Sequence, residues 1–103
     1  MDRVEALRAM LASDPKNTFA RYGLAMEFTK AGKVDEAIAE YKTLLENDAN
    51  YAAAYFHGGQ ALEQAGRVEE ARDWYERGIE VTRRTGDGHT QSELQAALDL
   101  LPI

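Results

Sequence analysis

The chain repeats itself with a period of 34 residues, and this period constrains the fold more than any other feature of the sequence. A shift of 34 positions aligns Gly32 with Gly66 and brings further identical residues together around this segment. The identical pairs are Ala20 with Ala54, Ala31 with Ala65, Gly32 with Gly66, Val34 with Val68, Glu36 with Glu70, Ala37 with Ala71, Tyr41 with Tyr75 and Glu46 with Glu80. A fixed period of this length is typical of stacked supersecondary units. We therefore expect one unit at residues 18–51 and a second at residues 52–85.

Each unit carries apolar residues at every third or fourth position, the spacing that places them on one face of a helix. In the first unit Ala20, Leu24 and Phe28 mark one such stripe, and Ala37 and Tyr41 belong to a second. The glycine between the stripes can adopt the left-handed conformation that ends a helix. Because this connection is short, we expect the two helices of a unit to run antiparallel.

The segments on either side of the two units also have helical patterns. Residues 2–17 carry the stripe of a half repeat, and residues 86–103 carry the apolar face of a capping helix after a glycine-rich break. We expect Asn17 and Asn50 to cap the helices that follow them. The sequence thus predicts a single domain over residues 1–103, an all-α superhelix (solenoid) of antiparallel helix pairs. Its six helices are expected near residues 2–12, 17–31, 34–47, 51–65, 68–84 and 89–101.

The composition excludes several classes of function. The chain has 18 Asp and Glu against 12 Lys and Arg, a net charge of −6, which argues against nucleic acid as a partner because phosphates are bound by cations. It has no cysteine, so disulfides and thiolate metal sites are excluded. No apolar run is long enough to cross a membrane, and the first residues lack the apolar core of a signal peptide. We therefore expect a cytoplasmic protein that does not bind membranes.

Groups that could perform catalysis are sparse. His57 and His89 are the only side chains that ordinarily titrate near neutral pH, and no spacing of Ser, His and Asp matches a catalytic set or a metal site. We interpret His57 as a hydrogen-bonding residue, because proton transfer needs a second positioned group. The sequence predicts a non-catalytic protein with no cofactor and no metal.

Two groups of residues are unusual for helices. Gly58 and Gly59 fall in the middle of a predicted helix, where each costs about 1 kcal/mol relative to alanine. We expect a close approach of two helices to explain them, with a hinge or a ligand pocket as the alternatives. Arg77, Arg83 and Arg84 lie toward the end of the fifth predicted helix. We interpret these cations as complementing the helix dipole, with a binding site for an anion as the alternative.

These features resemble the tetratricopeptide repeat (TPR) family, which has a 34-residue period and a signature of small and aromatic residues. The resemblance covers residues 2–85, and the last predicted helix resembles the capping helix of the family. Ala49 and Arg83 depart from the pattern, since the family usually has proline there, and Gly58 replaces a customary leucine. The matching residues are Leu24, Ala25, Phe28, Gly32, Ala37 and Tyr41 in the first unit, and Gly59, Leu62, Gly66, Ala71 and Tyr75 in the second.

The resemblance implies a role in protein–protein interaction. In this family the first helix of each unit lines a concave groove that binds a peptide or a partner helix. The helical spacing also places Phe19, Tyr22 and Met26 on the face opposite Leu24 and Phe28, so we expect that the core does not need them. The residues that the resemblance places in the groove are Phe19, Tyr22, Met26, Lys30, Phe56, His57 and Gln60.

The family's clamp of Lys, Asn and Arg, which grips the C-terminal carboxylates of chaperones, is not matched by this sequence. Tyr22, Met26 and His57 stand at three of the clamp positions, and Asp87 and Gln91 stand at the others. An acidic chain also repels an acidic tail. We expect a protein or peptide partner that is neutral to basic and carries apolar anchors.

Self-assembly is the alternative function. Leu100 and Ile103 lie away from the apolar face of the last predicted helix, and the first predicted helix lacks the partner that precedes it in a complete unit. Stacking of such faces between two copies would form a homodimer. The two hypotheses therefore differ in the oligomeric state that they require.

Overall fold

The computed structural model describes residues 2–103. No strand occurs in this range, so the predicted all-α class is confirmed. The ends of the observed helices agree with the predicted ones to within two residues. The six helices are α1 (Arg3–Ser13), α2 (Thr18–Lys30), α3 (Val34–Asn47), α4 (Ala52–Gln64), α5 (Val68–Thr85) and α6 (Gly88–Asp99).

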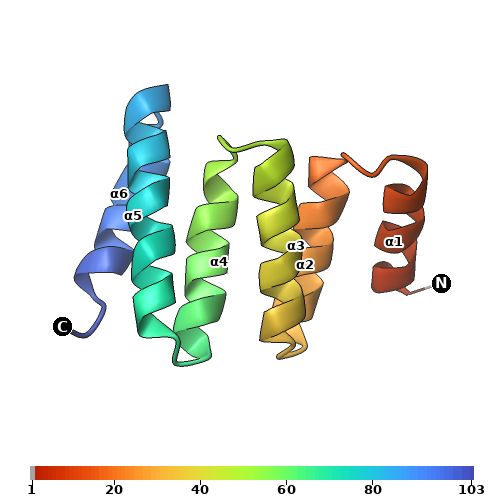
Figure 1. The fold of residues 1–103 in the computed structure, drawn as a ribbon, viewed down its shortest axis with the longest axis horizontal. Helices are drawn as coiled ribbons and strands as arrows, with labels where there is room; N and C mark the ends of the chain where they lie inside the picture. Colours follow the sequence, from red (N-terminus) through yellow and green to blue (C-terminus); the bar gives the residue numbers. More distant parts are fainter. Residues whose placement is uncertain (1) are drawn as a thin grey trace.

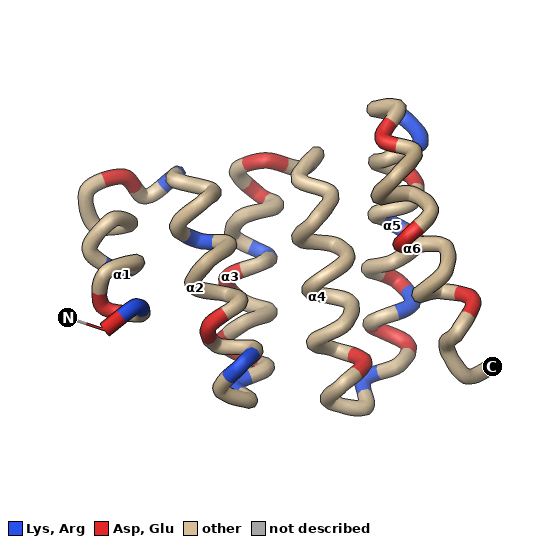
Figure 2. The backbone as a smooth tube through the Cα atoms, turned by 180° about the vertical axis from the view of Figure 1, so that it is seen from behind, with Lys and Arg blue, Asp and Glu red and all other residues tan. Residues whose placement is uncertain are grey.

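The helices stand side by side in a row, with the two chain ends at opposite ends of the row (Figure 1). The row measures 42 × 29 × 18 Å. Helices α2 and α6 lie behind α3 and α5 in Figure 1 and come to the front in the reverse view of Figure 2. Because α4 contacts both α2 and α6, we call these three helices the α2/α4/α6 layer, and we call the opposite side the α3/α5 layer.

Glycine makes the turns within the two helix pairs possible. Gly32 and Gly66 have φ angles of 77° and 79°, a left-handed conformation that residues with a Cβ rarely adopt. After the first turn the N–H of Lys33 donates to the carbonyl of Phe28 at 2.9 Å, and Arg67 makes the equivalent bond after the second. These bonds satisfy carbonyls at the helix end that have no partner within the helix. Because the bonds form only when the residue before Lys33 or Arg67 is left-handed, both repeats keep glycine here.

The predicted helix cap is right at one position and wrong at the other. The side chain of Asn17 accepts the backbone N–H three residues later at 3.0 Å. Asn50 does not cap α4, which begins after Tyr51 without a side-chain cap. The reason is that Tyr51 occupies the N-cap position, one residue later, while the side-chain oxygen of Asn50 accepts a hydrogen bond from Arg84 at 3.1 Å.

Two polar contacts join the first helix pair to the second, one at each end of the helices. At the glycine turns the guanidinium of Arg67 lies 2.6 Å from the carboxylate of Asp35. At the opposite end Arg84 donates to the side-chain oxygen of Asn50 at 3.1 Å. Both rims of the row are therefore tied together, one by an ion pair and one by a bond to a neutral amide.

The core alternates small and large side chains, as the sequence predicts. The large side chains of Tyr41 and Tyr75 are completely buried, and Phe28 and Leu62 are buried as well. Alanine stands where helices cross most closely, which lets the larger side chains interlock. The fully buried alanines of this kind are Ala20, Ala25, Ala37, Ala54 and Ala71.

Two aromatic side chains of α5 explain the glycines in α4. A Cβ added at Gly58 would overlap the indole ring of Trp74, and one added at Gly59 would overlap the ring of Tyr75. Both aromatic residues belong to α5, so its rings pack directly on the backbone of α4. The expected close approach of two helices is confirmed.

We predict that Gly58→Ala destabilises the protein, although alanine favours a helix over glycine by about 1 kcal/mol. Overpacking against an aromatic ring typically costs about 1–3 kcal/mol, so the expected net loss is up to about 2 kcal/mol. Urea unfolding measures this loss. Gln64→Ala, at the exposed end of the same helix, is the control and should not lower stability. A Gly58→Ala protein more stable than the wild type would contradict the contact with Trp74.

Candidate functional site

The seven candidate residues all lie on α2 or α4, and the structure divides them into two groups. Those of α2 line one cleft of about 510 Å³, together with Arg3 of α1 and with Gly23 and Glu27. Those of α4 do not line this cleft. The first group is Phe19, Tyr22, Met26 and Lys30, and the second is Phe56, His57 and Gln60.

The cleft between α1 and α2, called the α2 cleft below, combines an apolar wall with a charged rim. Phe19 is 67% exposed, so its ring is available to a partner. On the rim, the carboxylate of Glu27 lies 2.7 Å from the guanidinium of Arg3 and 3.6 Å from the ammonium of Lys30. Because these two cations share one carboxylate, the rim keeps one net positive charge.

Tyr22 connects the two groups of candidate residues. Its ring centroid lies 5.8 Å from that of His57 and 5.5 Å from that of Tyr51. The imidazole of His57 is in turn 5.2 Å from the ring of Phe56, in an edge-to-face arrangement. The α2 cleft therefore continues into a half-buried aromatic surface on α4.

The expectation that the core does not need Tyr22 and Met26 is wrong. Both side chains are half-buried and pack against the core. The hydroxyl of Tyr41 donates to the sulfur of Met26 at 3.1 Å, and the rings of Tyr22 and Tyr41 meet edge to face at 6.3 Å. The physical reason is that α2 packs on α1, α3 and α4 at once, so a second helix face is partly covered. Phe19 is the candidate aromatic residue that projects from this packing.

A second hollow, which was not predicted from the sequence, lies on the other side of Tyr22. It has a volume of about 380 Å³, and its lining includes Tyr51 and the carboxylates of Asp48 and Asp87. Hydrogen bonds from Thr90 lower the pKa of Asp87, so this carboxylate is charged at neutral pH. Asp48 and Tyr51 lie in the turn between the two repeats, so the sequence already placed an acidic and an aromatic residue close together there.

Residues 2–103 contain no cluster of three or more His, Asp and Glu side chains able to hold a metal ion. Within the same range no helix has the length and apolar character needed to span a bilayer. Burial lowers the pKa of His57, so its imidazole is neutral at pH 7 and can donate one hydrogen bond and accept another.

Stacked antiparallel helix pairs with an aromatic layer define an α-helical repeat protein, and sequence comparison identifies its family. The model of the family described as tetratricopeptide repeat matches residues 22–87, more than half of the chain. The chain belongs to the tetratricopeptide repeat family, as the sequence resemblance indicated.

Relatives with known sequences or structures agree with this family. A TPR repeat-containing protein of Pseudomonas aeruginosa is 30% identical over 95 residues, which cover 92% of this chain and 90% of the relative. The solution structure of a tetratricopeptide repeat domain protein from Salinibacter ruber is 40% identical, covers 82% of this chain and 86% of its own, and has a TM-score of 0.76. The first TPR of Spaghetti, bound to an HSP90 peptide, is 21% identical over 93% of this chain and 77% of its own, with a TM-score of 0.72.

We predict that His57 makes stability depend on pH. Burial lowers its folded pKa below the ordinary value of 6.5, while Gln60 and Glu93 offset part of this effect. At a pH between the pKa of His57 in the folded state and its pKa in the unfolded state, the unfolded state binds more protons. Stability therefore falls as the pH drops below 6.5. His57→Gln should reduce this fall, measured by urea unfolding at about pH 7.5 and about pH 5.5.

His89→Gln is the matched control for this experiment. The imidazole of His89 is 88% exposed and lies 3.1 Å from Glu93. We expect this variant to retain the part of the pH dependence that is due to His57. The assignment fails if His57→Gln has the same pH dependence as the wild type.

Proposed function

We propose that this chain is a non-catalytic adaptor of the cytoplasm that binds a peptide or a partner helix on its α2/α4/α6 layer. Members of the TPR family generally mediate protein–protein interaction. The observation that carries the proposal is the exposed ring of Phe19 beside the α2 cleft of about 510 Å³. A ring in this position offers an anchor point for an apolar side chain of the partner.

Charge supports a neutral-to-basic partner. The hollow beside Tyr51 contains two carboxylates, Asp48 and Asp87, and no cation in its lining. A Lys or Arg side chain of a bound segment would be attracted there and could lie against the rings of Tyr22 and Tyr51. The preferred ligand thus carries an apolar residue for the α2 cleft and a basic residue for this hollow.

Packing supports the proposed mechanism of rigid presentation. Tyr22 and Phe56 each contact the imidazole of His57 and pack on the buried core, so the surface is ordered before a partner arrives. A preordered surface lowers the entropy that is lost on binding. The affinity then depends on shape and apolar contact, and no reactive group is required.

The likeness to the Spaghetti structure supports a peptide as the ligand, since that relative of the same fold holds a peptide. The peptide there is one that this chain is not expected to bind. Its last residues are acidic, whereas the second hollow here is acidic itself. We therefore expect a mode of binding that the fold shares with this relative. The chemistry of the partner is set by this chain's own residues.

We predict that Phe19→Ala weakens binding of peptides selected from a displayed random library on the wild-type protein. Loss of one buried phenyl ring costs about 1.5–3 kcal/mol, which corresponds to at least about a tenfold rise in Kd. Titration calorimetry measures the change, and the melting temperature should stay the same because the ring is exposed. Met10→Ala removes another exposed apolar side chain outside the cleft and is the control. Equal affinity of the Phe19→Ala and wild-type proteins would refute the site.

Self-assembly is the second candidate function, and the exposure of Leu100 favours it. This side chain is 82% exposed, and Ile103 at the same end of the chain is exposed as well, so the two together offer an apolar contact for a second copy. Leu100→Ser is expected to abolish a homodimer that forms through this end of the row. Sedimentation equilibrium over a range of concentrations measures the oligomeric state, and a strict monomer would exclude this candidate.

A further inference from the structure

Helix α1, which forms one wall of the α2 cleft, is the least supported helix of the row. Among the helices of residues 2–103 it packs closely on α2 alone, whereas every other helix packs on at least two neighbours. Leu7 is the one side chain of α1 that is fully buried, and it packs on α2 at Gly23. The position of α1 therefore depends strongly on the contacts near its two ends.

The contacts of the N-terminal half of α1 are exposed. The guanidinium of Arg3 lies 2.7 Å from the carboxylate of Glu27, but the side chain of Arg3 is 63% exposed. Ion pairs of this kind contribute little to stability. The guanidinium of Arg8, another exposed side chain, lies over the ring of Phe28 at 5.7 Å from its centroid. These contacts alone do not hold α1 firmly against α2.

Arg21 of α2 supports the opposite end of α1. Its Nη2 donates to the backbone carbonyl of Pro15 at 2.8 Å, in the turn that follows the last residue of α1, Ser13. Its Nη1 lies 3.1 Å from the carboxylate of Glu40 on α3. Both side chains of this ion pair are largely buried, so dissolved ions screen the pair less than an exposed one. One guanidinium thus connects the turn after α1 to α3.

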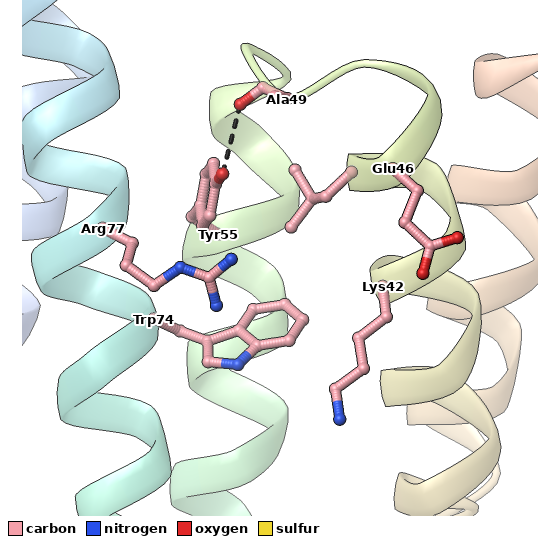
Figure 3. Close-up of a pocket in the computed structure, with 7 residues that line it drawn as sticks. Lys42, Glu46, Ala49, Tyr55, Trp74 and Arg77 are labelled. Atoms are coloured by element: carbon pink, nitrogen blue, oxygen red, sulfur yellow. Dashed lines mark hydrogen bonds between the residues drawn. The ribbon is translucent and has the colours of Figure 1, made fainter.

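The second repeat forms the same contact with different chemistry. Thirty-four residues after Pro15 and Arg21 stand Ala49 and Tyr55, and the hydroxyl of Tyr55 donates to the carbonyl of Ala49 at 3.1 Å (Figure 3). In both repeats the first helix therefore donates a hydrogen bond to the turn that precedes it. The helix before the second turn, α3, also packs on α2, whereas α1 packs on α2 alone. The contact from Arg21 thus has fewer others beside it.

We propose that Arg21 is a positioning residue of the α2 cleft, which holds the turn at Pro15 and so keeps α1 in the place that a bound segment requires. The inference rests on the binding site proposed above. Arg21 does not line the cleft, so a loss of affinity on its replacement cannot result from a lost contact with the ligand. When α1 takes the competent position for only part of the time, the apparent Kd rises by the inverse of that fraction.

The position of α1 is measured with two spin labels, because the chain has no cysteine of its own. Ala9→Cys on α1 and Glu76→Cys on α5 place the labels at exposed positions, and pulsed electron paramagnetic resonance gives the distribution of distances between them. In Arg21→Lys the single ammonium keeps the pair with Glu40 but does not also reach the carbonyl of Pro15. We expect a broader distribution in this variant. A distribution equal to that of the wild type would overturn the proposal.

Arg72→Lys is the matched control, because Arg72 makes the same kinds of contact at the other end of the row. Its guanidinium donates to the carbonyl of Pro102 at 2.5 Å and lies 3.5 Å from the carboxylate of Glu69. The substitution should leave the distance distribution of the labels unchanged, since neither contact involves α1. Equal broadening in Arg72→Lys would indicate a general loosening of the fold and overturn the role of Arg21.

Binding is measured by titration calorimetry with the peptides selected on the wild-type protein. Arg21→Lys is expected to raise their Kd at least about fivefold, as when α1 is in the competent position for about a fifth of the time. Arg72→Lys should leave the Kd unchanged. A broader distance distribution in Arg21→Lys without a change in Kd would overturn the positioning role.

Failure of this inference can be distinguished from failure of the proposed function. If Phe19→Ala binds the selected peptides as the wild type does, the binding site at the α2 cleft is wrong. The spin-label distances do not depend on any ligand, so they still decide whether Arg21 holds α1 in place.

Discussion

The contact of Trp74 and Tyr75 with the bare backbone of α4 is the interaction on which the rest of the structure depends. Glycine at positions 58 and 59 lets the two rings reach that backbone, so α5 lies closer to α4 than alanine would allow. This contact fixes how α4 is turned about its axis. Consequently Phe56 and His57 lie on the layer that faces α2, while Tyr55 and Trp74 pack against each other in the core.

The two layers are built from similar helices but present different chemistry. The α2/α4/α6 layer offers the ring of Phe19 and the carboxylates of Asp48 and Asp87. On the α3/α5 layer Trp74 is buried, and the cations Lys42 and Arg77 are accompanied by the carboxylates of Glu46 and Asp73. A net charge of −6 describes neither layer, because many of the charged side chains form ion pairs locally. Specificity in such a chain depends on the few charges that lack a close partner.

The sequence was sufficient to predict the helices, since a 34-residue period with glycine at each turn leaves one regular way to bury the apolar stripes. The half-burial of Tyr22 and Met26 was not predictable from spacing, because it results from three helices packing on α2 at once. The failed cap at Asn50 depends on Arg84, a residue of a distant helix that takes the side-chain oxygen of Asn50 as its acceptor. The burial of Trp74 depends on Gly58 of the neighbouring helix, a pairing that no single-helix pattern contains.

The two rim contacts between the helix pairs have a mechanical consequence. Arg67 and Asp35 are charged and exposed, so dissolved ions screen their attraction, whereas the bond from Arg84 ends on the neutral amide of Asn50 and is screened less. Concentrated electrolyte is therefore expected to weaken the contact between Arg67 and Asp35 more than the contact at the opposite rim.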